Sequence, residues 1–455
     1  MKHVHFIGIG GTGLSAIARV LLEKGYQVSG SDREESPLFR AVTAAGAATF
    51  VGHKGEQAAG ADLVIRSSAI PDDNPEVTYA LARQIPVLKR SAFLAELTQG
   101  QDTLAVAGTH GKTTTTAMLI WMLTEMGLDP SFIAGGVVNQ LKRNAHYGQG
   151  DYFVIEADEY DNMFLGLAPK VALVTNMEHD HPDCFPTPED YRKAFKAFLG
   201  RVQADGLALV CLDDPGAASL GGEMAASQAV LTYGSQPGAD YRAVEIRVEA
   251  GWPIFRLLHG DQDLGRVRLA VPGQHNVLNA AGALAALNEL GLGLEKALLA
   301  LRTFSGAGRR FEVLGEVNGI TVIDDYGHHP TEIAATLRAA QSRYPGRRIW
   351  AVWQPHTYSR TQSLESEFIR ALTLADRVGV LKIYAAREKD SGYSAKVIAD
   401  ALSGGKAVYL DDFETAADYL LQEIAPGDIL IVFSAGDATN VSQAVYQQLM
   451  MKERG

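Results

Sequence analysis

The chain has 455 residues, 47% hydrophobic and 21% charged, and this composition excludes a long disordered protein because ample apolar surface is available to offset chain entropy. Its length predicts roughly three domains of about 150 residues each. The 41 basic and 53 acidic residues give a net charge of -12, which disfavours a nucleic-acid partner, since such binding needs clustered cations. The net negative charge still allows a local phosphate-binding site.

Cysteine content and apolar runs point to a reducing, cytoplasmic compartment. Cys184 and Cys211 are too few for a disulfide framework or a four-cysteine zinc site, so we expect both to be small core residues. No apolar run approaches the roughly 18 residues of a membrane helix, so no membrane insertion is expected.

Short β-branched apolar runs alternate with amphipathic stretches, a pattern typical of α/β layers around parallel sheets. In the first segment the predicted elements are a strand at Val4–Ile9, a helix over about Leu14–Lys24, strands at Gln27–Ser31 and Leu63–Arg66, and a helix over Ala92–Leu97. A polar break at Gln99–Gln101 predicts the first boundary.

The second and third segments continue the alternation. The second has predicted strands at Thr103–Ala107, Tyr152–Ile155 and Val171–Thr175 and predicted helices at Thr113–Met126 and Asn276–Leu290. Helical spacing predicts one more helix, whose core positions are Tyr191, Phe195, Phe198, Leu199 and Val202. The glycines of Ser305–Gly308 predict a flexible second boundary. The third segment has predicted strands at Ile320–Ile323, Ile349–Trp353, Val378–Leu381 and Ile429–Phe433.

A glycine-rich loop separates the strand Thr103–Ala107 from the helix that follows. Its residues are Gly108, Thr109, His110, Gly111, Lys112, Thr113 and Thr114. Glycines let backbone N–H groups turn toward a phosphate, Lys112 neutralises terminal phosphates, and a threonine hydroxyl can ligate magnesium. The loop therefore predicts a nucleoside triphosphate site, with a simple helix-capping turn as the alternative.

A second glycine loop follows the first strand and fits the pattern G-x-G-x-x-G. Its residues are Gly8, Gly10, Gly11, Thr12 and Gly13, and Asp32 ends the next strand at a spacing suited to a ribose hydroxyl. The ligand is a dinucleotide or another nucleotide diphosphate, and a tight turn without a ligand is the alternative.

Two clusters in the second segment carry metal-ligand chemistry. Glu156–Asp161 (EADEYD) places four carboxylates beside the phosphate loop, which favours magnesium ligands over a solvated acidic turn. His179, His181 and Asp183 alone suggest a transition-metal hydrolase, while hydrogen-bonded loop histidines or a share in an ATP-magnesium site are the alternatives.

Two loops of the third segment combine histidine with aspartate or arginine. Asp324–Pro330 (DDYGHHP) and Gln354–Arg360 (QPHTYSR) each follow a predicted strand. Ligands of open α/β sheets bind at the carboxyl ends of strands, so we expect these loops to form a site.

Taken in order, these motifs resemble the Mur ligases, the ATP-dependent amino-acid ligases of peptidoglycan precursor synthesis. The resemblance covers essentially the whole chain, and Asp324–Ile333 (DDYGHHPTEI) and Gln354–Thr361 (QPHTYSRT) are most similar to the L-alanine-adding members. It implies an α/β protein of three domains: a Rossmann-like UDP-substrate domain at 1–99, a central P-loop ATPase-type α/β domain at 100–307 and a Rossmann-like C-terminal domain at 308–455.

The implied activity is ATP-dependent ligation of L-alanine to the lactyl carboxylate of UDP-N-acetylmuramate through an acyl phosphate. The products are UDP-N-acetylmuramoyl-L-alanine, ADP and phosphate. The alternative within the family is a recycling ligase that adds the L-Ala-γ-D-Glu-diaminopimelate tripeptide. The resemblance also implies ATP, two Mg²⁺ ions, small-molecule substrates and a monomer or homodimer. Three other classes of protein would each account for only one of these motifs: a NAD-dependent oxidoreductase, a metallohydrolase and a nucleotide-binding switch.

The resemblance assigns roles to individual residues. Lys112, Glu156, His181 and His328 are the implied catalytic residues, and Thr113, Glu156 and His181 the implied metal ligands. ATP is implied to bind the phosphate loop together with Asn276, Asn279, Arg310 and Asp325. Gly8, Gly10, Gly11, Thr12, Gly13, Asp32, Ser67 and Ser68 are implied to bind the UDP substrate, and Tyr326, His328, His356 and Arg360 to line the muramyl and amino-acid side.

The sequence departs from the family pattern at three positions. Thr357 stands where many members have arginine, and Tyr160 where others have serine. Phe195 aligns with the lysine that several relatives carbamylate, so no carbamate is expected here.

Overall fold

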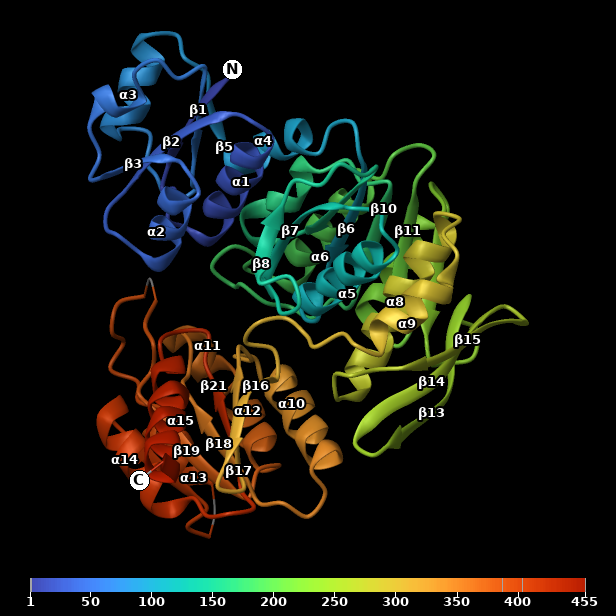
Figure 1. Cartoon of the computed structure of the whole chain (residues 1–455), viewed down its shortest axis with the longest axis vertical. Helices are drawn as coiled ribbons and strands as arrows, with labels where there is room; N and C mark the ends of the chain where they lie inside the picture. Colours follow the sequence, from blue (N-terminus) through green and yellow to red (C-terminus); the bar gives the residue numbers. More distant parts are fainter. Residues whose placement is uncertain (1, 387, 403, 455) are drawn as a thin grey trace. The chain divides into compact units, whose positions relative to one another are not determined.

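The computed structural model describes residues 2–386, 388–402 and 404–454. The chain divides into two compact units. The first comprises Met1–Glu245, Phe255–Val267 and Leu278–Phe304, and the second comprises Ile246–Ile254, Arg268–Val277 and Ser305–Gly455. Three β-sheets follow one another along the sequence, drawn in blue, green to yellow, and orange to red in Figure 1.

The first sheet has five parallel strands in the order β3-β2-β1-β4-β5. They are β1 (His3–Ile7), β2 (Gln27–Asp32), β3 (Ala48–Val51), β4 (Leu63–Arg66) and β5 (Val87–Lys89). Core residues from α1 (Thr12–Glu23), α2 (Pro37–Ala44) and α4 (Arg90–Leu97) pack on one face, and those from η1 (Gly55–Ala58) and α3 (Pro75–Ala82) on the other (Figure 1). Since helices cover both faces, the central strand is almost wholly buried, which explains its apolar run.

The central sheet has ten strands in the order β15-β14-β13-β12-β11-β10-β6-β9-β7-β8. They are β6 (Asp102–Ala107), β7 (Ser131–Val138), β8 (Arg143–His146), β9 (Tyr152–Glu156), β10 (Val171–Val174), β11 (Leu207–Cys211), β12 (Val230–Gly234), β13 (Tyr241–Glu249), β14 (Trp252–His259) and β15 (Gln262–Arg268). Its middle is parallel, and an antiparallel β7–β8 pair forms one edge. The helices of this region are α5 (Lys112–Glu125), η2 (Tyr160–Gly166), α6 (Pro188–Leu199), α7 (Pro215–Met224), α8 (Gln274–Glu289) and α9 (Leu294–Leu301).

The third sheet has six strands in the order β16-β17-β21-β18-β19-β20. Only β16 (Glu312–Val317) runs antiparallel to its neighbour; the parallel strands are β17 (Ile320–Asp325), β18 (Ile349–Trp353), β19 (Arg377–Leu381), β20 (Ala407–Leu410) and β21 (Ile429–Phe433). The helices are α10 (Pro330–Arg343), α11 (Tyr358–Ser363), α12 (Glu365–Leu372), α13 (Lys396–Ala401), α14 (Phe413–Glu423) and α15 (Thr439–Arg454). Separate apolar clusters fill the two faces, as in other sheets with helices on both sides.

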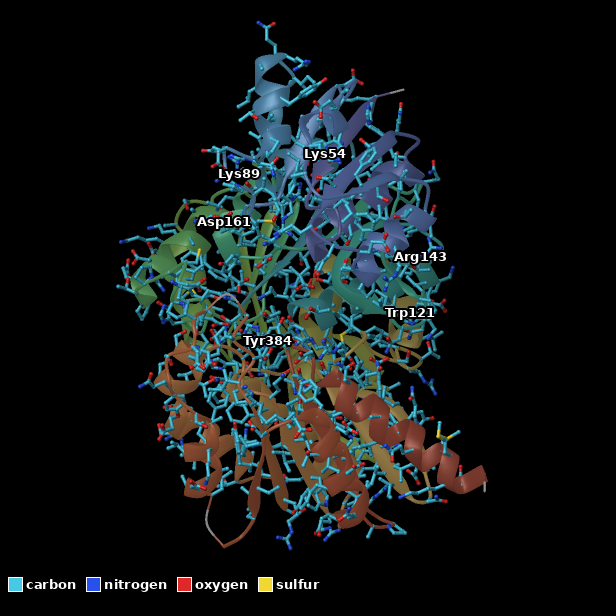
Figure 2. All side chains as sticks on the ribbon, turned by 90° about the vertical axis from the view of Figure 1, so that its left-hand side faces the viewer. Lys54, Lys89, Trp121, Arg143, Asp161 and Tyr384 are labelled. Carbon is cyan, nitrogen blue, oxygen red and sulfur yellow. The ribbon has the colours of Figure 1, made fainter. Side chains whose placement is uncertain are left out.

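Two side-chain hydrogen bonds tie the helix after the phosphate loop and the β7–β8 turn to the end of the first unit. Trp121 on α5, labelled in Figure 2, donates from Nε1 to the carbonyl of Ala300 at 3.0 Å. Gln140 donates to the carbonyl of Thr303 at 2.8 Å. These bonds hold α5 against the last turn of α9, and the β7–β8 turn against the residues that follow α9.

The predicted strands and helices with stated bounds are confirmed, and their ends differ from the observed ones by at most two residues. One core position was wrong: α6 ends at Leu199 with Gly200 as its C-cap, so Val202 lies beyond the helix. Cys211 is buried as expected, whereas Cys184 is only half-buried. Within the described part of the chain, no helix is both long enough and apolar enough to cross a membrane.

Candidate active site

The predicted phosphate loop lies between β6 and α5. Gly108 has φ +135° and Gly111 has φ +81°, so both adopt backbone conformations that favour glycine. A Cβ on Gly108 would lie 2.0 Å from Oγ1 of Thr175, and one on Gly111 would lie 2.8 Å from Oδ1 of Asn279. Lys112, Thr113 and Thr114 open α5, whose N-terminus carries no side-chain cap among the described residues. The loop therefore presents an open helix N-terminus, a natural anion site.

The ammonium of Lys112 is held inside this loop. It donates to the carbonyls of Gly108 at 2.5 Å and Thr109 at 3.1 Å, and it lies 3.0 Å from a carboxylate oxygen of Glu159. Burial lowers the pKa of Lys112, but the carboxylates of Glu159, Asp158 and Glu156 outweigh it, so the pKa lies above its usual value. The ammonium stays charged and has a buried counter-ion before any nucleotide binds.

Glu156 ends β9 directly beside the start of α5. Its Oε1 accepts from the hydroxyl of Thr113 at 3.1 Å, and its Oε2 accepts from the backbone N–H of Gly135 at 2.7 Å. A Cβ on Gly135 would lie 2.5 Å from the carboxylate, so a larger residue there would displace the Glu156 side chain. Hydroxyl and carboxylate oxygens next to a phosphate loop match the donor set that Mg²⁺ prefers. Thr113 and Glu156 thus fit the predicted metal role.

His181 lies near the Lys112–Glu159 pair, whereas the other two members of its predicted cluster bond to other partners. Its Nε2 is 3.7 Å from Oε1 of Glu159. His179 instead donates from Nε2 to the carbonyl of Phe185 at 2.8 Å, and Asp183 accepts from the hydroxyl of Tyr160 at 2.9 Å. These separate partners give no support to a three-ligand hydrolase centre.

The first glycine loop is held from within its own domain. Gly10 donates its N–H to Oδ2 of Asp32 at 2.8 Å, and Gly11 donates to the carbonyl of Gly8 at 3.1 Å. Asp32, predicted to meet a ribose, therefore also fixes the loop conformation. Ser67 packs beside Gly8, whose added Cβ would lie 3.2 Å from the Cβ of the serine. Ser68 lies in the turn after β4, and Thr12 and Gly13 open α1.

Helix α8 carries both asparagines of the predicted adenine-side motif. Asn276 and Asn279 are buried and lie within the first turns of the helix. Asn276 donates from Nδ2 to the carbonyl of Pro272 at 2.7 Å, which caps the loop that enters α8. Asn279 abuts Gly111 of the phosphate loop, as described above, so this member of the motif does meet the loop.

In the second unit, Asp325 ends β17 in a buried position. It accepts backbone N–H bonds from Phe311 at 2.8 Å and Gly327 at 2.7 Å. Burial raises the pKa of Asp325 to about 6, although Arg310 and the two backbone donors act in the opposite direction. The Arg310 guanidinium lies 4.9 Å from the ring centroid of Tyr326 and 3.3 Å from Glu332.

Four aromatic rings form a row over the carboxyl ends of β17, β18 and β19. The centroids of Tyr326 and His328 are 5.5 Å apart, those of His328 and His356 5.7 Å, and those of His356 and Tyr384 5.7 Å. Arg360 reaches Nδ1 of His356 at 3.3 Å. The predicted residues of this side thus converge within the second unit. Tyr384, labelled in Figure 2, also belongs to this row, although no sequence motif predicted it.

Thr357, which stands at the variant position, has an unusual backbone. Its φ of +67° and ψ of 146° lie in a region that β-branched residues rarely adopt. The conformation is held because its N–H donates to the carbonyl of Tyr384 at 2.9 Å and its own carbonyl accepts from Oγ1 of Thr361 at 2.6 Å. The motif loop is therefore fastened to the residues after β19.

Sequence reasoning did not single out Glu159 within its acidic run. Glu159 is 1% exposed, and besides Lys112 it accepts from the hydroxyl of Tyr191 at 3.3 Å. Its residue type does not distinguish it from the other three carboxylates of the run. The only available signal is its spacing from Glu156, which ends a strand.

Comparison with known families matches all three segments of the chain. Residues 3–102 match the Mur ligase family catalytic domain, residues 106–287 the Mur ligase middle domain, and residues 309–436 the Mur ligase glutamate ligase domain.

Individual relatives are similar over almost their whole length. The UDP-N-acetylmuramate–L-alanine ligase of Desulforamulus reducens is 44% identical, with 99% of this chain and 98% of the relative covered. That of Renibacterium salmoninarum is 44% identical, with 99% and 96% covered. Among solved structures, the UDP-N-acetylmuramate–alanine ligase of Thermotoga maritima has a TM-score of 0.84 at 28% identity, covering 99% and 100% of the two chains. The murein peptide ligase of Psychrobacter arcticus has a TM-score of 0.69 at 26% identity, covering 99% of each. These matches, together with the phosphate loop and the three sheets, establish that the chain belongs to the Mur ligase family.

Proposed function

We propose that this protein joins L-alanine to the lactyl carboxylate of UDP-N-acetylmuramate, with conversion of ATP to ADP and phosphate. The observation that carries the proposal is the near full-length similarity, at 41–44% identity, to relatives named for this reaction. The phosphate loop with its buried lysine supports the use of ATP. A cytoplasmic location, where nucleotides are available, is part of the proposal.

We assign the reactants to three domains at 1–99, 100–307 and 308–455. The first glycine loop, with Asp32, Ser67 and Ser68, receives the UDP part of the acid. The central domain receives ATP at residues 108–114, with Asn276 and Asn279 on its adenine side. The aromatic row of the C-terminal domain receives the amino acid and muramyl group. Arg310 and Asp325 act on the nucleotide from that domain.

A carboxylate is a poor electrophile at neutral pH, so it must be activated before an amide can form. In the proposed first step the lactyl carboxylate attacks the γ-phosphate of ATP and becomes an acyl phosphate, while the bond to the β–γ bridging oxygen breaks and ADP leaves. Lys112 and the N-terminus of α5 orient the phosphates and stabilise their charge. Thr113 and Glu156, with His181 nearby, would hold Mg²⁺, which supplies further charge neutralisation when bound.

In the second step the amine of L-alanine attacks the acyl carbon and phosphate leaves. The amine must lose a proton, and the geometry of His328 suits it to accept one. Its Nδ1 lies 3.1 Å from the carbonyl of Tyr326, which can only accept, so Nδ1 carries the ring proton. In the neutral form of the ring the lone pair is then on Nε2, as a general base requires.

The test is ADP release from purified protein with ATP, Mg²⁺ and UDP-N-acetylmuramate, with and without L-alanine. We expect release to require L-alanine and the UDP product to gain the mass of one alanyl residue. A parallel reaction with the L-Ala-γ-D-Glu-diaminopimelate tripeptide tests the recycling alternative. Preference for the tripeptide would overturn the L-alanine assignment, and ADP release without any acceptor would overturn the ligase assignment.

A further inference from the structure

A cavity of about 130 Å³ lies within the first unit, between α1 and α4 on one side and β7 and β9 on the other. Its lining includes Thr12 and Gly13 from the first glycine loop, and Gly135 and Glu156 beside the ATP loop. The cavity is therefore bordered by the first glycine loop and by Glu156, which contacts Thr113 at the start of α5. Since water occupies about 30 Å³ per molecule in the liquid, it has room for a phosphate or carboxylate group.

Arg90, the first residue of α4, lies across the first turn of α1. A Cβ on Gly13 would be 1.5 Å from its Nη1, so Gly13 leaves the space that this side chain fills. The side chain is 21% exposed, and it makes no hydrogen bond to the described residues. Its one ion-pair partner among them is Asp158, at 3.6 Å. The guanidinium thus borders the cavity with only this long contact to a carboxylate among the described residues.

The electrostatics of this position are unfavourable without an anion. The first turn of a helix carries positive partial charge, so a cation there is destabilising. Burial lowers the pKa of Arg90, while Asp158 and Asp161 raise it less strongly. On the other side, Glu156 and Asp158 would repel an acid that enters the cavity. Among the described lining residues, Arg90 is the cation that can offset this repulsion.

We propose that Arg90 binds an oxyanion of the nucleotide-linked acid in this cavity, either its diphosphate or its lactyl carboxylate. The inference rests on the proposed function and adds a substrate-binding residue from α4. A planar guanidinium pairs with either group through two parallel N–H···O bonds. On binding, Arg90 exchanges its long contact with Asp158 for the substrate oxyanion.

The experiment compares R90A and R90K with the matched variant D158N, which removes the ion pair but leaves the guanidinium. Steady-state rates give KM for UDP-N-acetylmuramate and for ATP, and calorimetry gives the affinities for UDP-N-acetylmuramate and UDP-N-acetylglucosamine, which lacks the lactyl acid. We expect R90A to raise KM for UDP-N-acetylmuramate at least tenfold and to change KM for ATP less than twofold. R90K should lie between, and D158N should leave KM for the acid unchanged or lower it.

The two UDP-sugars distinguish the sources of the oxyanion. Equal loss of affinity for both in R90A assigns the contact to the diphosphate, and loss confined to UDP-N-acetylmuramate assigns it to the carboxylate. Unchanged affinity in R90A, or the same loss in D158N, overturns the proposal and leaves a structural ion pair. If R90A does not fold, R90K against D158N makes the same comparison. Failure of the proposed function is separate, since it appears as absent L-alanine-dependent ADP release in the unaltered protein.

Discussion

The Lys112 ammonium lies 3.0 Å from the Glu159 carboxylate, and Glu159 is almost fully buried. With the carbonyls of Gly108 and Thr109, this carboxylate occupies the N–H donors that the Lys112 ammonium would offer to a nucleotide. ATP must therefore take the ammonium from an internal partner. The carboxylate also adds negative charge close to the phosphates, which lowers nucleotide affinity while it fixes the lysine.

The substitution E159Q keeps the shape of this contact and removes its charge. We expect the dissociation constant for ADP to fall about three- to tenfold, because about 1 kcal/mol of repulsion is relieved. We also expect kcat to fall at least tenfold, because Lys112 loses its orienting partner. Calorimetry and steady-state rates measure the two effects, with Y191F as a control that keeps the charge. Weaker ADP binding in E159Q would contradict this account.

The substitution E156Q tests the metal role at the end of β9. An amide is a weaker ligand for Mg²⁺ than a carboxylate, so we expect the free Mg²⁺ for half-maximal rate to rise at least tenfold. Rates measured against free Mg²⁺ at fixed ATP give this value. The matched control is D161N, because Asp161 belongs to the same acidic run. Asp161 is labelled in Figure 2. An unchanged Mg²⁺ requirement in E156Q would remove Glu156 from the site.

The substitution G108A tests the backbone of the phosphate loop. An alanine there would combine a φ of +135° with a Cβ 2.0 Å from Thr175. We expect a loss of about 3 kcal/mol in the free energy of unfolding, together with loss of nucleotide binding. G222A is the control, since Gly222 lies in α7 with open space around it, and should stabilise by about 0.5–1 kcal/mol. Equal unfolding midpoints for the two variants would contradict the strain argument.

Asp325 predicts a pH dependence of stability. Its folded pKa of about 6 lies above its ordinary value of 3.8, so folding takes up a proton between these pH values. The stability it contributes is complete below about pH 4 and is lost as pH rises through 6, a change of about 3 kcal/mol. D325N removes this titration. Urea unfolding followed by the fluorescence of Trp350 and Trp353, in the same sheet, should show a gap between wild type and D325N that changes by this amount from pH 4 to 7. Parallel pH profiles would refute it.

The buried parallel strands could be predicted closely from sequence. Ile349–Trp353 and Ile429–Phe433 are continuous apolar runs because helices cover both sheet faces, and β18 and β21 have these same bounds. β13 and β15 were not predicted, since their many exposed and half-buried residues give no such run. β14 and the buried strand β11 were also missed. The end of α6 was missed because Val202 continues the helical spacing beyond the Gly200 cap.

The site was predictable where one short motif supplies all the parts, as in residues 108–114. It was not predictable where function depends on contacts between distant positions. Glu159 is 47 residues from Lys112, and three neighbouring carboxylates look equally suitable in the sequence. Arg90 packs against α1 because Gly13 has no side chain to fill that space. No local sequence pattern predicts this contact. Tyr384 reaches His356 because β18 and β19 are adjacent.

The indole of Trp121 gives the central domain an optical reporter. Of the four tryptophans, it alone lies on the helix that begins at the phosphate loop; the others are Trp252, Trp350 and Trp353. Its Nε1 bond to Ala300 holds the ring in a fixed polar environment, to which indole emission is sensitive. In a chain whose other three tryptophans are replaced by phenylalanine, the emission wavelength of Trp121 would report changes in the contact between α5 and α9. No attached dye would be needed.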